Sequence, residues 1–295
     1  MDFDTFIGQG WDQHVKDCAG VAARLQTDGI ALLSEAKQIV PLAHLAHHVM
    51  GDHLGRWQDA LLFQQRLAAL PLCQPGSTEA LALRRFMASL QLASGAADER
   101  AALSASDAVR VTALAATSLA EQHTARALLL FEDALAQADR AALPDTDPCT
   151  RALAVSGNNL DATLAEKPQR NAEERSLMIL AAQTARRYWA IAGGWLETER
   201  AEYRLAMTWL KAGDPALARQ HALNCLHIVE TNQAPALERF FALDALVQAE
   251  RAAGNGTAQE QTLALAQAES AFAALGEGDR GWCQPTLDRL RTPAS

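Results

Sequence analysis

The segment from Glu199 to Val229 restricts the fold more than any other part of the chain. It holds two amphipathic stretches separated by Gly213-Asp214-Pro215. An acid followed by proline is a typical helix start, because the acid caps free backbone N–H groups and proline suits the first helical position. Small residues stand where the two stretches would face each other, so their backbones can approach closely. We therefore predict a helical hairpin in this segment.

Weaker copies of this hairpin recur along the chain. Residues at spacings of three and four share one face of a helix. The anchor residues of three copies, Ala127, Met178 and Ala218, are about 40 to 50 residues apart, a period typical of stacked helical hairpins. β-branched residues never form an alternating run, and aromatic residues make up only 5% of the chain. The chain is therefore predicted to be all-α.

Residues 199 to 232 resemble the tetratricopeptide repeat (TPR) family. The matching residues are Leu205-Ala206 and Trp209 on the first helix, Gly213-Asp214 at the turn, and Ala218, Ala222 and Cys225 on the second helix. Ala222 replaces the usual aromatic residue, and Cys225 replaces the usual alanine. The other copies are degenerate and exceed the usual spacing of about 34 residues, as in long-helix variants from bacterial signalling and regulatory proteins. The resemblance covers residues 40 to 275 and implies a TPR-like α-solenoid, a right-handed superhelix of antiparallel helical hairpins.

Three regions are expected along the chain. Residues 1–40 would form N-terminal capping helices, from Trp11 to Gln26 and from Ile30 to Val40, because a stack of repeats needs a polar cover at its end. Residues 41–275 would form the TPR-like helical repeat domain. Residues 276–295 would form a C-terminal capping helix, from Gln284 to Arg291, and a tail. Homodimer formation through either end is left open.

Charge and composition argue against several kinds of partner. The net charge is -9 and the pI is near 5.4, whereas a nucleic-acid-binding chain needs a basic stripe. The five cysteines form no CxxC pair and fit buried thiols in a reducing compartment. The sequence has no run of about 20 apolar residues and no signal-peptide pattern at its N-terminus. We expect a cytoplasmic protein that binds neither nucleic acid nor a membrane.

A stack of hairpins offers a groove for a partner, because its first helices line the concave side. Such positions contact peptide ligands in the family that the chain resembles. Asparagine amides can both donate to and accept from a peptide backbone, and Arg200 and Lys211 could bind a carboxylate. The residues predicted to contact the partner are Asn158, Asn159, Arg200, Tyr203, Met207, Lys211, Phe241, Asp244 and Gln248. The leading prediction is a scaffold or adaptor that binds a peptide or protein partner, with no cofactor and no catalytic activity.

Two other functions are left open. The first is a ligand-sensing bacterial regulator that acts through a partner protein. The second is a metal-dependent enzyme that uses the cluster from His44 to His53, in which His44, His47 and His48 have helical spacing and Asp52 follows. No second ligand pair stands out, and the HExxH, GxSxG and phosphate-loop motifs are absent. A polar, half-buried helix is therefore the preferred interpretation of these histidines.

Overall fold

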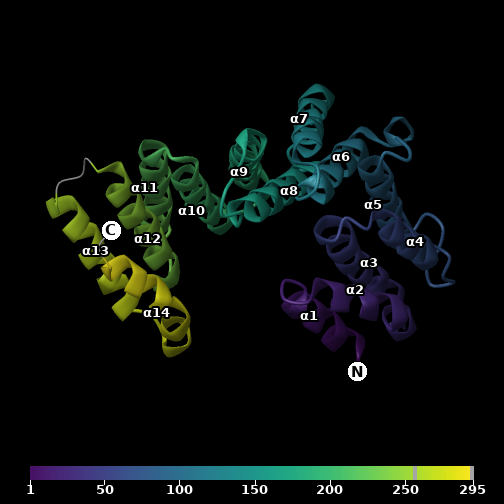
Figure 1. The fold of residues 1–295 in the computed structure, drawn as a ribbon, viewed down its shortest axis with the longest axis horizontal. Helices are drawn as coiled ribbons and strands as arrows, with labels where there is room; N and C mark the ends of the chain where they lie inside the picture. Colours follow the sequence, from purple (N-terminus) through teal and green to yellow (C-terminus); the bar gives the residue numbers. More distant parts are fainter. Residues whose placement is uncertain (255–257, 293–295) are drawn as a thin grey trace. The chain divides into compact units, whose positions relative to one another are not determined.

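The computed structural model describes residues 1–254 and 258–292 (Figure 1). Every regular element in these two ranges is a helix and none is a strand, as the sequence predicts. Contacts divide the chain into two compact units, Met1–Ala152 and Leu153–Ser295, and consecutive helices pack against each other within each unit. Among the helices of the described residues, none combines the length and the apolar character that crossing a membrane requires.

The N-terminal unit packs its helices around an apolar core, in which Leu42, Leu45 and Phe63 are fully buried. Ser77 and Ser104 each start a helix by accepting a hydrogen bond from a backbone N–H group. The α-helices are α1 (Phe3–Gln13), α2 (Cys18–Thr27), α3 (Ile39–Ala46), α4 (Trp57–Ala68), α5 (Thr78–Ser94), α6 (Ala105–Leu119) and α7 (Thr124–Ala141). The other turns are the 3₁₀ helices η1 (Gly29–Leu32), η2 (Ala36–Gln38) and η4 (Arg100–Ala102) and the π-helix η3 (His47–His53).

The two N-terminal helices predicted within residues 1–40 are wrong in their bounds. One helix does not run from Trp11 to Gln26, because α1 ends at Gln13 and the Asp17 carboxylate caps a new helix. In place of a helix from Ile30 to Val40, the 3₁₀ turns η1 and η2 precede α3, which begins at Ile39. The sequence pattern does not reveal these two breaks, because apolar residues continue across them at helical spacing.

In the C-terminal unit, the segment predicted to form a hairpin contains two packed helices, α10 (Trp195–Ala212) and α11 (Pro215–Thr231). Gly213 between them has a φ of 81°, a left-handed conformation that glycine adopts without steric cost. Asp214 then caps α11 through the backbone N–H of Leu217. The buried residues of the pair include Leu205, Ala206, Ala218, Ala222 and Cys225. The preceding helices of the unit are α8 (Pro148–Ala165), which begins in the N-terminal unit, and α9 (Ala172–Ala192).

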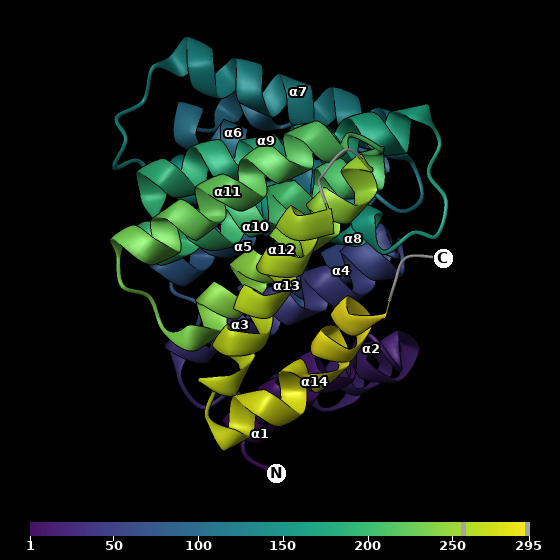
Figure 2. The same ribbon diagram turned by 90° about the vertical axis from the view of Figure 1, so that its left-hand side faces the viewer.

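Three further helices, α12 (Ala236–Ala253), α13 (Ala258–Ala273) and α14 (Glu277–Arg291), pack together in this unit (Figure 2). Phe240 and Leu243 of α12 share a buried cluster with Leu287 of α14. The predicted start of the last helix is wrong, because α14 begins at Glu277 instead of Gln284 and includes Pro285. Packing against α12 and α13 therefore outweighs the helix-breaking tendency of the proline.

Candidate functional site

Two adjoining hollows in the C-terminal unit bring together most of the residues predicted to bind a partner. The first has a volume of about 430 Å³ and is lined by Asn158, Asp161, Ala165, Arg200, Tyr203, Arg204, Met207, Thr208 and Lys211. The second has a volume of about 380 Å³ and is lined by Glu199, Arg200, Tyr203, Leu237, Glu238, Phe241 and Trp282. Since Arg200 and Tyr203 line both, we treat the two hollows as one surface and call it the α10 groove.

Helix α10 provides the central face of this groove. The groove residues Arg200, Tyr203, Arg204, Met207 and Lys211 each stand three or four positions from another member of the set, which places them on one side of the helix. Ala201, Leu205 and Ala206 lie between them in the sequence and are buried. Four of the predicted contact residues, Arg200, Tyr203, Met207 and Lys211, therefore lie on this side of α10.

Aromatic side chains from three helices form the apolar part of the α10 groove. The rings of Tyr203 and Phe241 meet edge to face, with their centroids 5.7 Å apart. The Trp282 ring of α14 has its centroid 5.2 Å from that of Phe241, and the residue remains 65% exposed. An exposed tryptophan beside packed aromatic rings is typical of surfaces that bury a partner, because tryptophan gains much from losing contact with water.

Two of the predicted contact residues, Asp244 and Gln248, do not line the α10 groove. They are linked by hydrogen bonds to Tyr203, which does line it. The Tyr203 hydroxyl donates to Asp244 Oδ2 at 3.1 Å, and Gln248 Nε2 donates to Asp244 Oδ1 at 2.8 Å. Arg289 of α14 also donates to Asp244 at 3.2 Å. Burial raises the pKa of Asp244, while Arg289 and the Tyr203 hydroxyl oppose the rise. Because Asp244 is fully buried, its role in this structure is to position Tyr203.

The charged residues at the mouth of the groove include one accessible cation. Arg200 donates to Glu238 at 2.9 Å, yet the Arg200 side chain remains 64% exposed. The guanidinium has further N–H donors beside the one that Glu238 accepts, so a ligand carboxylate could bind Arg200 next to Glu238. Nearby Glu199 is buried and accepts a hydrogen bond from the Cys225 thiol, but its Oε2 atom has no partner in the described part of the structure. Burial raises the pKa of Glu199.

The other two cations of the groove already donate hydrogen bonds to protein oxygens. Arg204 donates to Asp161 Oδ2 at 3.0 Å, and the Thr208 hydroxyl donates to Asp161 Oδ1 at 2.7 Å. Lys211 donates to the Ala165 carbonyl at 2.7 Å. Burial raises the pKa of Asp161 and lowers the pKa of Lys211. Arg204, Asp161 and Thr208 were not predicted as site residues, although Arg204 has helical spacing from Arg200.

The two predicted asparagines differ in their positions. Asn158 lines the groove, and no hydrogen bond from its amide to another described residue is present. Asn159 is half-buried on α8 and lines neither hollow. Trp282 was missed because α14 reaches the groove only through the fold and has no sequence motif that points to it.

The predicted metal ligands His44, His47, His48 and Asp52 do not converge on one point in the described structure. His47 is fully buried, 3.1 Å from Ser118 Oγ, and burial lowers its pKa to about 4. Burial alone would raise the pKa of Asp52, but hydrogen bonds from His48 and Ser118 and the proximity of His47 lower it overall. The exposed His44 ring lies against Phe86, with centroids 6.2 Å apart. These four side chains therefore do not share one position where a metal ion could bind all of them.

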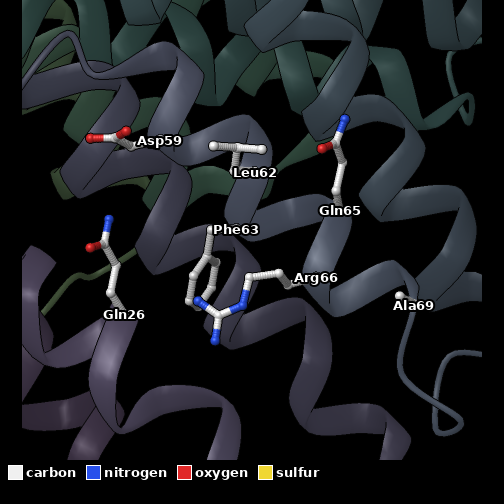
Figure 3. A pocket seen from close by; sticks show the side chains of 7 residues that line it. All are labelled: Gln26, Asp59, Leu62, Phe63, Gln65, Arg66 and Ala69. Atoms are coloured by element: carbon white, nitrogen blue, oxygen red, sulfur yellow. The ribbon is translucent and has the colours of Figure 1, made fainter.

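The N-terminal unit has a hollow of about 570 Å³ on the outer face of α4 (Figure 3). Its residues are Gln26, Asp59, Leu62, Phe63, Gln65, Arg66 and Ala69. The Arg66 guanidinium lies over the Phe63 ring, with its Cζ atom 6.0 Å from the ring centroid. Apart from Gln26, all of these residues belong to or directly follow α4, so the hollow is an open helix surface, and none of the predicted site residues lines it.

Comparison with protein-family models and with curated proteins gives no match for this sequence. The function of the α10 groove is therefore inferred from its geometry and chemistry.

Proposed function

We propose that this protein is a scaffold or adaptor that binds a peptide or protein partner in the α10 groove. The observation that carries this proposal is the exposed Trp282, which lies against Phe241 in a hollow that Arg200 also lines. Aromatic residues and arginine contribute most of the binding energy at many protein interfaces. A partner segment with an apolar anchor and a carboxylate matches this combination.

The other groove residues suggest how the partner is aligned. The Asn158 amide can pair with both a donor and an acceptor of an extended backbone.

We also infer that the helices of the C-terminal unit form TPR-like antiparallel hairpins with a right-handed superhelical twist. The tight turn at Gly213 and the buried small residues of α10 and α11 support the hairpin arrangement, and the resemblance to the TPR family suggests the twist. In such an arrangement α8, α10 and α12 would be the first helices of successive hairpins. These are the helices that provide most of the groove residues.

A peptide-display selection tests the proposed function. Random peptides are selected on the full-length protein, and the dissociation constants of enriched peptides are measured by fluorescence anisotropy. The variant Asn158→Ala, Arg200→Ala, Trp282→Ala should weaken binding at least about 10-fold, since each single hot-spot contact can contribute more than 1 kcal/mol. The matched control carries Gln220→Ala, Leu223→Ala and Asn224→Ala on the exposed face of α11. Peptides that bind the groove variant and wild type equally would disprove the groove assignment.

A further inference from the structure

Three histidines from two separate elements converge in the N-terminal unit, far from the α10 groove in the sequence. His14 is the C-terminal cap of α1, whereas His48 and His53 belong to the π-helix η3. One ligand atom from each lies within 4.8 Å of the other two. The ring centroids are 5.0 Å apart for His14 and His48, 5.4 Å for His14 and His53, and 4.5 Å for His48 and His53.

The hydrogen bonds of the Nδ1 atoms determine what the other ring nitrogens can do. His14 Nδ1 is 2.5 Å from the Trp11 carbonyl, His48 Nδ1 is 3.0 Å from Asp52 Oδ2, and His53 Nδ1 is 3.2 Å from Glu121 Oε1. All three partners are acceptors, so each Nδ1 carries the proton of a neutral imidazole. The Nε2 atoms are then left with lone pairs, which is the state in which histidine binds a metal ion.

Two of these Nε2 atoms lie close to each other. His48 Nε2 lies 3.0 Å from His53 Nε2. If both Nδ1 atoms are protonated, no hydrogen is available between the two Nε2 atoms, and a cation must compensate their repulsion. That cation is either an extra proton or a metal ion. Two nitrogens that bind one tetrahedral zinc ion at about 2.0–2.1 Å are separated by roughly 3.3 Å, so a small outward movement of the rings would admit zinc.

The π-helix explains how two histidines five residues apart reach the same point. In an α-helix, with about 3.6 residues per turn, side chains five apart point in clearly different directions. In a π-helix the hydrogen bonds join residues five apart, and here the Leu54 N–H donates to the Val49 carbonyl at 3.2 Å. His48 and His53 therefore lie one above the other. π-helical turns are rare and frequently occur at functional sites.

We propose that His14, His48 and His53 form a binding site for a zinc ion, with the fourth coordination position open to water. Three imidazoles and one open position are typical of zinc sites that polarise a bound water molecule. Asp52 and Glu121 act from outside the ligand set, because a carboxylate that accepts from Nδ1 fixes the ring and makes the ligand more basic. The Trp11 indole packs on two of the ligands, with centroids 5.5 Å from His14 and 5.2 Å from His48.

Metal titration of the full-length, chelator-treated protein tests this site. Zinc affinity is measured by competition with a chromophoric chelator, and cobalt is added separately to record the visible absorption of a tetrahedral ion. Wild type should bind one zinc ion per chain. His14→Ala should weaken zinc binding by more than about 100-fold, and Asp52→Asn by about 10- to 100-fold, the usual effect of losing an outer carboxylate.

His44→Ala is the matched control, because His44 is an exposed histidine that also contacts Trp11, with centroids 5.3 Å apart, but is not one of the three converging residues. It should keep wild-type zinc affinity. Circular dichroism establishes that each variant is folded, and His53→Gln provides a second ligand variant if His14→Ala is not. Wild-type protein that binds no zinc and shows no cobalt absorption, or ligand variants that bind zinc as wild type does, would overturn the proposal and leave a shared proton as the cation.

Discussion

Ser118 connects two residues that lie far from it in the sequence. Its hydroxyl donates to Asp52 Oδ1 at 2.6 Å, and its oxygen lies 3.1 Å from His47 Nε2. All three side chains are buried, so Ser118→Ala removes a donor from a buried carboxylate. We expect the free energy of unfolding to fall by about 1–3 kcal/mol in urea denaturation. Ser94→Ala removes an exposed hydroxyl and should change it by less than about 0.5 kcal/mol; equal losses in both variants would contradict this role of Ser118.

His47 should make the protein sensitive to acid. Burial lowers its pKa from 6.5 to about 4, with Asp52 opposing the shift and His44 and His48 adding to it. The unfolded chain therefore binds a proton at a pH where the folded chain does not. Stability should decrease as the pH falls from about 6.5 to 4, by up to about 3 kcal/mol, and His47 should cause no further loss below that range.

The variant His47→Gln isolates this contribution, because glutamine does not titrate. Urea denaturation of wild type and variant is measured at several pH values in the presence of a chelator, so that metal binding does not contribute. The variant should lose less stability than wild type between pH 6.5 and 4. Parallel pH profiles of the two proteins would show that His47 does not cause the acid sensitivity.

At the scale of helices, α8 and α9 approach each other closely at Gly157. A Cβ atom at Gly157 would lie 2.6 Å from the Ala181 carbonyl oxygen and 2.9 Å from the Ala185 nitrogen. Both are backbone atoms, so Gly157→Ala must push the helices apart, with an expected loss of about 1–3 kcal/mol. Gly281→Ala in α14 is the control, because its Cβ would meet nothing within 4 Å. Thermal unfolding should separate the two variants clearly, and similar melting temperatures would refute the close packing.

Individual helices could be predicted from the sequence where the signal is local. The face of α10 and the turn at Gly213 depend on spacing and turn chemistry within a few residues, and both are found in the structure. The π-helix η3 was not predicted, because the same residues also fit an α-helical pattern. Asp244 was assigned to the groove because it shares helical spacing with Phe241, but periodicity does not distinguish a partly exposed position from one fully buried under a neighbouring helix.

At the level of the whole chain, the contacts that the sequence could not reveal are those between distant elements. The His14 ring contacts the His48 ring because the chain leaves α1 at this position. The Trp282 ring contacts the Phe241 ring because α14 packs on α12. Neither pair has a characteristic spacing in the sequence. The all-helical class was predictable because composition and periodicity act along the entire chain.

Zinc binding should stabilise one compact unit and not the other. A ligand that binds only the folded state shifts the folding equilibrium by about the ratio of its free concentration to its dissociation constant, a factor of about 100 when the concentration is 100 times that constant. Buried Cys73 reports opening of the N-terminal unit, and buried Cys225 reports opening of the C-terminal unit. Labelling of each thiol in moderate urea, followed by mass spectrometry, should show Cys73 slowed about 100-fold by saturating zinc and Cys225 unchanged. The variant His14→Ala should abolish the effect at Cys73.

Equal slowing of both thiols would mean that the chain unfolds as one cooperative unit, and no slowing at either would contradict zinc binding to the folded N-terminal unit.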